Sequence, residues 1–222
     1  MKYFDQDFVD FFKDLAKNNK QEWFHANKKR YESSIKKPFE GFLKDLILSM
    51  RQEDSTITVE PKDCTLRINR DLRFSKDKTP YNLHYSAVVS STGRKDKSVP
   101  GIFLRFTPEE VGIMGGAYVL DKEQLQAVRS SIAENPKAFQ QLITDPSFIS
   151  VFGKLKGEES KRIPFEFQSV FQNEPLVAKK QFYFVATHPA DLITSDQLLE
   201  TVIAHWHAAR PLNEYFTKSM RT

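Results

Sequence analysis

The stretch that decides the fold runs from Arg67 to His84 and reads R-I-N-R-D-L-R-F-S-K-D-K-T-P-Y-N-L-H. From Cys64 to Ser75, apolar residues take the even positions and polar residues the odd ones, with Arg70 as the exception. This alternation predicts a half-buried strand, because successive side chains of a strand point to opposite faces. Arg70 would then lie on the apolar face. Its permanent charge needs a carboxylate, a set of carbonyls or a bound anion there, unless a bulge near Asp71 turns it outward.

The residues that follow this strand favour a bound anion. Ser75 or Thr79 can cap a short turn or helix with Pro80 at its first position, and the free N–H groups of such an end attract negative charge. Eight cations and three acids lie between Arg67 and Lys97, a net charge of +5, whereas the whole chain carries +4. The positive excess is therefore local, which argues against a broad nucleic-acid surface.

The sequence thus predicts a site for a small phosphate- or carboxylate-bearing ligand. Its arginines would clamp the anion, Lys76 and Lys78 would add charge, and Tyr81 and His84 would hydrogen-bond or stack. Asp71 and Asp77 would orient the arginines, because nearby cations lower the pKa of a carboxylate and leave it a weak base. The predicted ligand-binding residues are Arg67, Arg70, Asp71, Arg73, Ser75, Lys76, Asp77, Lys78, Tyr81 and His84.

Two alternatives to a small ligand stay open. In the first, the same residues form an internal ion-pair network within a protein-interaction or structural domain. In the second, the basic residues of the 93–97 loop bind single-stranded nucleic acid, with Phe103, Arg105 and Tyr118 as a stacking surface. No catalytic residue is identified, so the sequence leaves open whether the protein is an enzyme.

Composition limits the classes of protein to which the chain can belong. The 222 residues include 19 Phe and suffice for one domain, residues 1–222, with an aromatic-rich core. The single cysteine, Cys64, excludes an internal disulfide, fits the cytoplasm, and is expected to be a packed thiol. No apolar run reaches the roughly 20 residues that span a bilayer. His205 and His207 are too close in sequence for a helical metal pair, and the sequence predicts no metal and no cofactor.

Helices are expected on the N-terminal side of the signature. Apolar residues from Phe8 to Leu15 follow helical spacing, and that helix is expected to end at Asn18-Asn19. Asn19 with Glu22 resembles a capping box for a second helix, which Pro38 interrupts. The residues from Phe39 to Met50 then predict a strongly amphipathic helix.

Strands are expected after the signature. The ranges Tyr85–Ser91, Gly101–Thr107 and Val111–Val119 read as strands, and their short connections imply antiparallel pairing. A further strand is expected where phenylalanines recur from Phe165 to Phe171. The stretch Phe182–Ala186 is apolar on both faces and is expected to be a central strand.

More helices are expected in the second half of the chain. Asp121 with Gln124 predicts a capped helix, and Asn135-Pro136 and Asp145-Pro146 open two shorter ones. Thr194 with Gln197 opens the last helix, and Pro211 restarts it. The predicted fold class is therefore α+β, a largely antiparallel central sheet with helices packed from both chain ends.

Three stretches carry a resemblance to a known family: N-N-K-Q-E-W-F at Asn18–Phe24, the signature up to Tyr81, and G-G-A-Y at Gly115–Tyr118 with Leu125 and Arg129 behind it. The chain resembles the family catalogued as domain of unknown function 2461. The resemblance covers most of the chain and implies no activity. It implies a hallmark made of Arg70, Asp71, Arg73, Phe74, Ser75, Lys76, Asp77, Lys78, Pro80 and Tyr81.

The chain departs from this family in two places. Asn82 stands where the family usually has lysine, and Ile163-Pro164-Phe165-Glu166 lacks the lysine and glycine that usually follow the proline. If the latter segment helps to close a site in the family, the ligand or activity of this protein differs or is lost.

Overall fold

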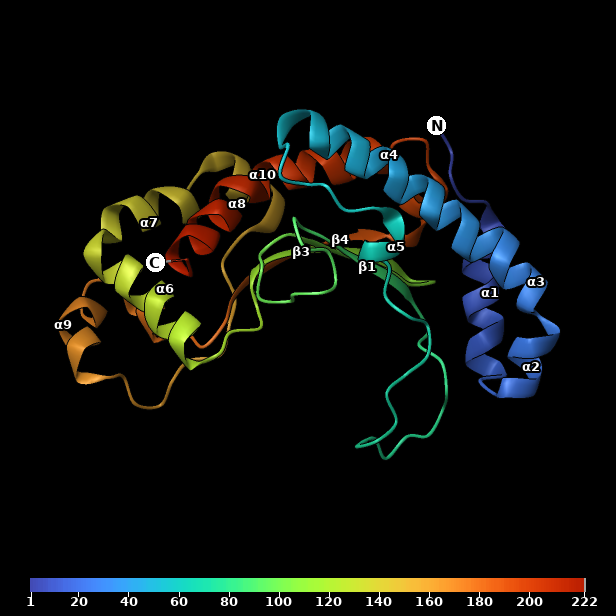
Figure 1. The fold of residues 1–222 in the computed structure, drawn as a ribbon, viewed down its shortest axis with the longest axis horizontal. Coiled ribbons are helices and arrows are strands. Elements are labelled where there is room, and N and C mark those ends of the chain that lie inside the picture. The colour runs from blue at the N-terminus through green and yellow to red at the C-terminus, as the bar shows by residue number, and fades with distance from the viewer. Residues whose placement is uncertain (222) are drawn as a thin grey trace. The chain divides into compact units, whose positions relative to one another are not determined.

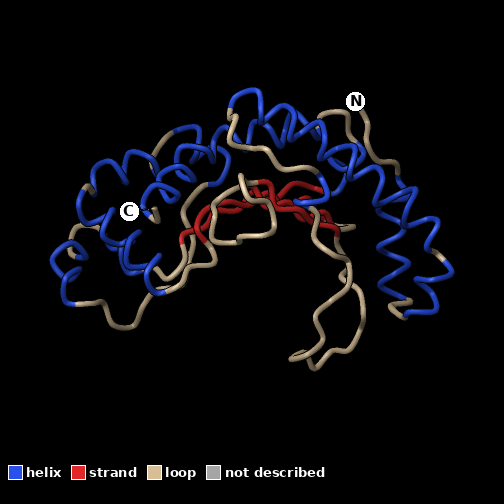
Figure 2. The backbone as a smooth tube through the Cα atoms, viewed as in Figure 1, coloured by secondary structure: helices blue, strands red, loops and turns tan. Residues whose placement is uncertain are grey.

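The computed structural model of the protein describes residues 1–221 and has the predicted α+β fold. It contains a four-stranded antiparallel sheet in the order β1-β2-β3-β4, together with helices (Figures 1 and 2). The strands are β1 (Tyr85–Val89), β2 (Ile102–Phe106), β3 (Glu110–Ala117) and β4 (Phe182–Pro189). The three strands expected between residues 85 and 119 are confirmed.

The described chain divides into two compact units, and the sheet contributes residues to both. Unit 1 comprises residues 1–95, 103–113 and 187–204, and unit 2 comprises residues 96–102, 114–186 and those from 205 onward. Each unit is described by itself below. The expectation of a single domain over residues 1–222 stays a prediction.

Unit 1 is built around phenylalanine side chains. Its helical elements are α1 (Gln6–Lys17), α2 (Gln21–Ala26), α3 (Lys28–Arg30), the π-helix η1 (Tyr31–Lys36), α4 (Lys37–Glu53), α5 (Pro61–Cys64) and η4 (Ala190–Thr194). Helix α4 packs on β1 and β2 (Figure 1): the centroid of the Phe39 ring lies 4.8 Å from that of Tyr85 and 5.4 Å from that of Phe106. The stripe of apolar residues predicted for α4 is buried. The aromatic-rich core is thus confirmed here.

Unit 2 is mainly helical. Its elements are α6 (Lys122–Glu134), α7 (Pro136–Ile143), α8 (Pro146–Phe152), η2 (Phe165–Phe167), α9 (Gln168–Phe171) and η3 (Pro175–Ala178). Helix α10 (Leu198–Ser219) contributes residues to both units. As predicted, the side chains of Asp121, Asn135 and Asp145 cap α6, α7 and α8.

In unit 2 the strand expected at Phe165–Phe171 is wrong, whereas the strand expected at Phe182–Ala186 is present as β4 but does not have the central position predicted for it. The residues from Phe165 to Phe171 form η2 and α9, and Phe165 is exposed while Phe167 is buried, so the phenylalanines share no strand face. Strand β4 is an edge strand by its place in the sheet order. It is nevertheless apolar because the rings of Phe182 and Phe184 are fully buried by helices, the latter against Phe148 and Phe152.

Both prolines expected to interrupt helices lie within them. Pro38 stands in the first turn of α4, directly after η1, so the chain stays helical from Lys28 to Glu53. A π-helical turn before a proline makes room for the ring and for the carbonyl that loses its N–H partner. Pro211 lies inside α10. The last capping box is also not formed as expected, since Gln197 N–H donates to Ser195 Oγ, 3.1 Å away.

Cys64 is fully buried at the end of α5, and its burial raises the pKa of the thiol to about 12. The packed thiol expected from the sequence is therefore confirmed. Of the helices described, none combines the length and the apolar character that crossing a bilayer requires.

Candidate functional site

The signature does not form the predicted strand. Cys64 closes α5, and residues 66–84 are loop apart from isolated antiparallel bridges that pair Thr65 with Ala87 and Asn69 with Tyr81 (Figure 2). Short hydrogen bonds fix this irregular hairpin, such as Arg70 N–H to the Pro80 carbonyl at 2.9 Å. Strand pairing does not continue beyond the bridge of Asn69 with Tyr81, because side chains at the tip of the hairpin form hydrogen bonds with the local backbone and so compete with strand pairing.

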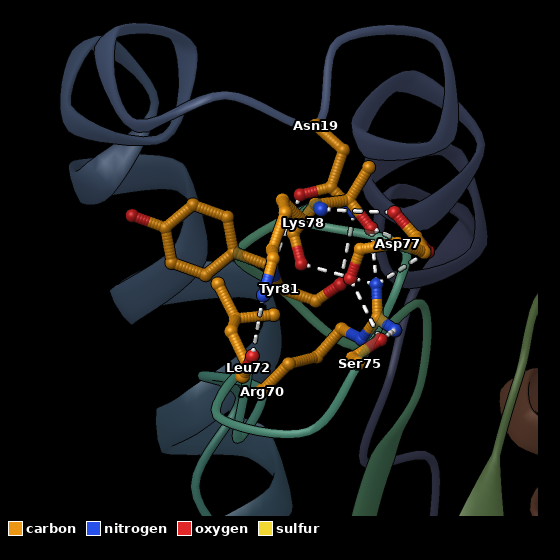
Figure 3. A network of polar contacts seen from close by, with 8 residues as sticks. Asn19, Arg70, Leu72, Ser75, Asp77, Lys78 and Tyr81 are labelled. Atoms are coloured by element: carbon orange, nitrogen blue, oxygen red, sulfur yellow. Dashed lines mark hydrogen bonds and ion pairs between the residues drawn. The ribbon is translucent and has the colours of Figure 1, made fainter.

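Arg70 does not lie on an apolar strand face as the alternation predicted, because its side chain contacts polar groups of its own loop. Its Nη1 donates to the Asp77 carboxylate at 2.6 Å and to the Thr79 carbonyl at 3.1 Å, and it also contacts the Thr79 hydroxyl (Figure 3). Its Nη2 donates to Ser75 Oγ at 3.3 Å. The side chain is only 23% exposed. Of the partners that the sequence allowed for Arg70, a carboxylate, carbonyls or a bound anion, its own loop supplies a carboxylate and a carbonyl.

Asp77 ties together both sides of the loop tip. Its carboxylate accepts the Thr79 N–H at 2.9 Å and the Thr79 hydroxyl at 3.0 Å in addition to Arg70. The Thr79 N–H, then Arg70, hold the pKa of Asp77 below its ordinary value. Ser75 Oγ donates to the Asp77 carbonyl at 2.8 Å. Arg70, Ser75, Asp77 and Thr79 thus form one network, called the Arg70 lock below.

Arg73 pairs with Asp71 on the outer side of the loop. Its Nε and Nη2 donate to the two carboxylate oxygens at 3.0 and 2.7 Å, while Arg67 Nη2 lies 4.0 Å from the same group. Arg73 holds the pKa of Asp71 far below its usual range. The side chains of Arg67 and Arg73 are 68% and 76% exposed. The three arginines therefore do not converge on one point.

The loop tip also displays an aromatic ring. Phe74 is 96% exposed, and the Arg73 guanidinium carbon lies 5.9 Å from its ring centroid. Lys76 is exposed next to it, whereas Lys78 turns back so that Nζ donates to the Leu72 carbonyl at 2.9 Å (Figure 3). Lys78 is thus partly committed to shaping the loop.

Tyr81 anchors the loop and is not displayed to a ligand. Only 4% of the residue is exposed, and its ring stacks on Phe24 of α2 with centroids 4.1 Å apart. The Asn19 side chain donates to the Tyr81 carbonyl at 2.9 Å and accepts the Tyr81 N–H at 3.1 Å. In Figure 3 the Tyr81 ring points away from the Arg70 lock. This clamp also explains why the predicted capping box at Asn19 is wrong: the N-cap of α2 is Lys20, without a side-chain cap.

His84 lies apart from the lock, near β2. Burial, and secondarily the charge of Arg105, lower the pKa of His84. Arg105 donates to the Glu110 carboxylate at 2.7 Å, so one cation of the proposed nucleic-acid surface is already paired. The short turn or helix expected after Ser75 or Thr79 is not formed, because residues 75–84 are loop apart from the bridge at Tyr81.

Sequence reasoning missed the residues that position the loop. Asn19 and Phe24 lie over fifty residues upstream of Tyr81, and no local pattern links them. A signal existed, however, because the Asn18–Phe24 stretch was one of the three that carry the family resemblance. Phe74 was expected on an apolar face, whereas the loop tip places it in solvent.

The arrangement provides positive charge rather than acid-base chemistry. Both aspartates have lowered pKa values and are held by cations or N–H groups, which makes them poor bases. No group of three or more potential metal ligands is found in residues 1–221.

Comparison with protein families gives a match over nearly the whole chain. A family described as "Conserved hypothetical protein (DUF2461)" matches residues 7–215, nearly the whole chain. Comparison with curated proteins and with solved structures found no significant match. The family resemblance seen in the sequence is therefore confirmed.

Proposed function

We propose a ligand-binding function for this chain, which belongs to the DUF2461 family of conserved hypothetical proteins. The proposed site is the outer side of the loop tip, where Arg67, Arg73, Lys76 and Phe74 are exposed. Its proposed ligand carries a phosphate or carboxylate group attached to an apolar or aromatic group. The anionic part would meet the cations, and the apolar part would pack on the Phe74 ring.

The observation that carries this proposal is the exposure of Phe74 on a fixed loop. A single exposed apolar side chain needs no explanation by itself. Phe74, however, stands between ends that the Arg70 lock holds together, and Arg73 lies over its ring. A ring held in one place loses less conformational freedom when it binds, which favours binding.

The charges on the loop divide into structural and available ones. Of the five cations between Arg67 and Lys78, Arg70 is committed to Asp77, and Asp71 is shared by two arginines. Exposed ion pairs contribute little to stability, because water screens both charges. Arg73 can therefore exchange Asp71 for a ligand oxyanion at small cost, whereas Arg70 cannot leave Asp77 without opening the loop.

A thermal-shift screen tests the proposal. Wild type, Arg73→Ala and Phe74→Ala are compared with inorganic phosphate, sulfate, sugar phosphates, dicarboxylates and nucleotides at constant ionic strength. A ligand at one hundred times its Kd adds about 2.7 kcal/mol to the stability of the native state. We expect the ring-bearing anions to raise the Tm of the wild type most, and both variants to lose this increment.

Lys95→Ala is the matched control. Lys95 is an exposed cation of the 93–97 loop, so its removal changes the net charge as Arg73→Ala does but leaves the proposed site intact. The proposal fails if no anion raises the Tm of the wild type. It also fails if Lys95→Ala and Arg73→Ala weaken the response equally, because the effect would then be one of net charge alone.

A second candidate is supported by the Arg70 lock itself. If the signature serves only to hold the loop, the protein is a structural or protein-interaction domain. Arg70→Ala would then lower the Tm, while Arg73→Ala and Phe74→Ala would change neither the Tm nor any response to anions. The cytoplasmic location and the identity of protein partners stay predictions.

A further inference from the structure

A second concentration of buried positive charge lies in unit 2, outside the signature. Arg129 is on α6, on the face that carries the fully buried Val128 and Ile132, and only 5% of the residue is exposed. A guanidinium stays protonated, so burial of this side chain also buries a full positive charge. Such a charge requires compensation from its surroundings.

The partners of Arg129 are neutral oxygens. Its Nη2 donates to Ser160 Oγ at 2.7 Å and to the carbonyls of Ala178 and Lys179 at 3.3 and 3.2 Å. Its Nε is buried and has no hydrogen-bond partner in the described residues. No hydrogen bond of Nη1 is found there either. The Glu166 carboxylate accepts from the Gln126 side chain at 3.0 Å. It acts on the Arg129 charge through space only.

The carbonyls that Arg129 contacts lie at the end of η3, where a cation is favourable. This contact uses one of the three guanidinium nitrogens. It leaves the buried Nε donor without an acceptor, which is unfavourable. Fastening η3 to α6 therefore does not account for the whole side chain.

A second cation adds to the positive potential. Lys179 is 7% exposed, and its Nζ donates to the Gly157 carbonyl at 3.1 Å, with the exposed Glu159 carboxylate 3.6 Å away. Arg129 and Lys179 are fifty residues apart in the sequence, but Arg129 donates to the Lys179 carbonyl. Two buried cations brought together in this way, with the exposed Glu159 carboxylate beside one of them, favour an anion between them and the solvent.

The backbone around Ser160 is built tightly against these cations. Gly157 has φ +147°, and a Cβ there would lie 1.8 Å from the Gln181 carbonyl oxygen, so only glycine fits. The Ser160 N–H donates to the Ala178 carbonyl at 2.8 Å, and Lys180 N–H donates to the Glu158 carbonyl at 2.7 Å. These contacts fix Ser160 Oγ beside Arg129. Because that hydroxyl accepts from Nη2, its own proton is available to a further acceptor.

We propose that Arg129 and Ser160 form a binding site for one oxyanion, either a phosphate or a carboxylate group. The anion accepts from Nε and Nη1 of Arg129 and from the Ser160 hydroxyl, and Lys179 adds attraction without direct contact. The site lies wholly within unit 2 and does not rest on the function proposed for the signature loop.

NMR titration of the full chain with inorganic phosphate, and separately with acetate, tests this site. The readout is the arginine Nε–H signals at constant ionic strength, with Arg129→Lys used to assign the Arg129 signal by its loss. We expect the Arg129 signal to shift and reach a plateau with one of the two anions. Which anion saturates the shift distinguishes a phosphate site from a carboxylate site.

Ser160→Ala measures the contribution of the Ser160 hydroxyl to the affinity for the anion. It also tests the site if Arg129→Lys does not fold. Loss of one hydrogen bond to a charged group should weaken the affinity about tenfold. Ser150→Ala is the matched control, since Ser150 is an exposed serine of the same unit whose hydroxyl donates to the Ser147 carbonyl. Arg73→Ala should leave the titration unchanged, which separates this site from the signature loop.

Three results would overturn the proposal. The first is an Arg129 signal that does not shift on addition of either anion. The second is a shift without a plateau that follows the signals of exposed arginines, which would indicate adventitious association. The third is an affinity in Ser160→Ala equal to that of the wild type.

Discussion

The clamp between Asn19 and Tyr81 makes a prediction that separates two roles for one side chain. The sequence pattern suggested that Asn19 caps α2, whereas in the structure it bonds both backbone groups of Tyr81. Aspartate caps a helix about as well as asparagine does. It cannot donate to a carbonyl, however. Asn19→Asp should therefore be neutral if Asn19 is a cap and destabilising if it is a clamp.

The magnitude follows from the two hydrogen bonds. Asn19→Ala removes both and leaves the N–H and carbonyl of the buried Tyr81 without their partner, which should cost about 2 kcal/mol at roughly 1 kcal/mol per bond. Asn19→Asp keeps the bond from the Tyr81 N–H but sets a carboxylate against the Tyr81 carbonyl, so it should cost at least about 1 kcal/mol. Asn18→Ala, which removes one exposed bond to the Asp14 carbonyl, should cost no more than about 0.5 kcal/mol.

Urea unfolding at pH 7 and 25 °C measures these differences. Tryptophan fluorescence is a suitable probe because Trp23 of α2 lies 5.6 Å from Phe11 in the same unit. The comparison requires equal m values, so that a shift in midpoint reports stability alone. If Asn19→Asp is as stable as the wild type, the clamp contributes nothing and the reasoning about Tyr81 is refuted.

Three further predictions concern the backbone, pH and the thiol. Gly116→Ala should destabilise by about 3 kcal/mol, because φ is +99° and a Cβ would lie 2.2 Å from a carbonyl oxygen, whereas Gly41→Ala in the open on α4 should stabilise by about 0.5–1 kcal/mol; equal effects in urea unfolding would contradict this. Hydrogen bonding from Arg30 lowers the folded-state pKa of Asp7, so the pair stabilises the fold above the unfolded pKa of about 3.8, and this stability is lost as pH falls through the lower folded pKa. Asp7→Asn should therefore flatten the acid side of a stability-pH curve, and an unchanged curve would exclude this role. Cys64, with its pKa raised to about 12, should react slowly with a thiol-specific disulfide reagent at pH 8 until urea is added, and rapid reaction of the native protein would contradict its burial.

Local patterns predicted the elements that local forces decide. The caps at Asp121, Asn135 and Asp145 form because each side chain reaches an N–H within three residues, so neighbouring sequence suffices. The failures at Pro38 and Asn19 have the opposite origin. A π-turn absorbs the proline, and a partner 62 residues away takes the asparagine side chain, and neither is visible in a short window.

The predicted binding role of the signature residues stays a prediction, but the structure shows how these residues are arranged. Of the three partners that the sequence allowed for Arg70, a carboxylate, a set of carbonyls or a bound anion, the structure shows the Asp77 carboxylate and the Thr79 carbonyl, although the strand face from which they were derived is not formed. Its partner, Asp77, was expected to orient the arginines, and it pairs with Arg70; which of the arginines it would hold could not be predicted, because the sequence gives no distance between residues seven apart in a loop. The structure turns part of the predicted clamp inward and leaves Arg67, Arg73 and Lys76 in solvent.

This division changes what the charge excess means. Five cations and two acids lie between Arg67 and Lys78. Arg70 is bonded within its own loop, while Arg67, Arg73 and Lys76 are exposed on the loop that Arg70 and Tyr81 help to fix. A ligand at the tip would therefore depend on Arg70 without touching it. Arg70→Ala should consequently lose both anion binding and loop stability, whereas Arg73→Ala should lose anion binding and keep loop stability. The second result distinguishes a binding loop from a structural lock, because a loop that is only structural has no binding to lose while its stability is kept.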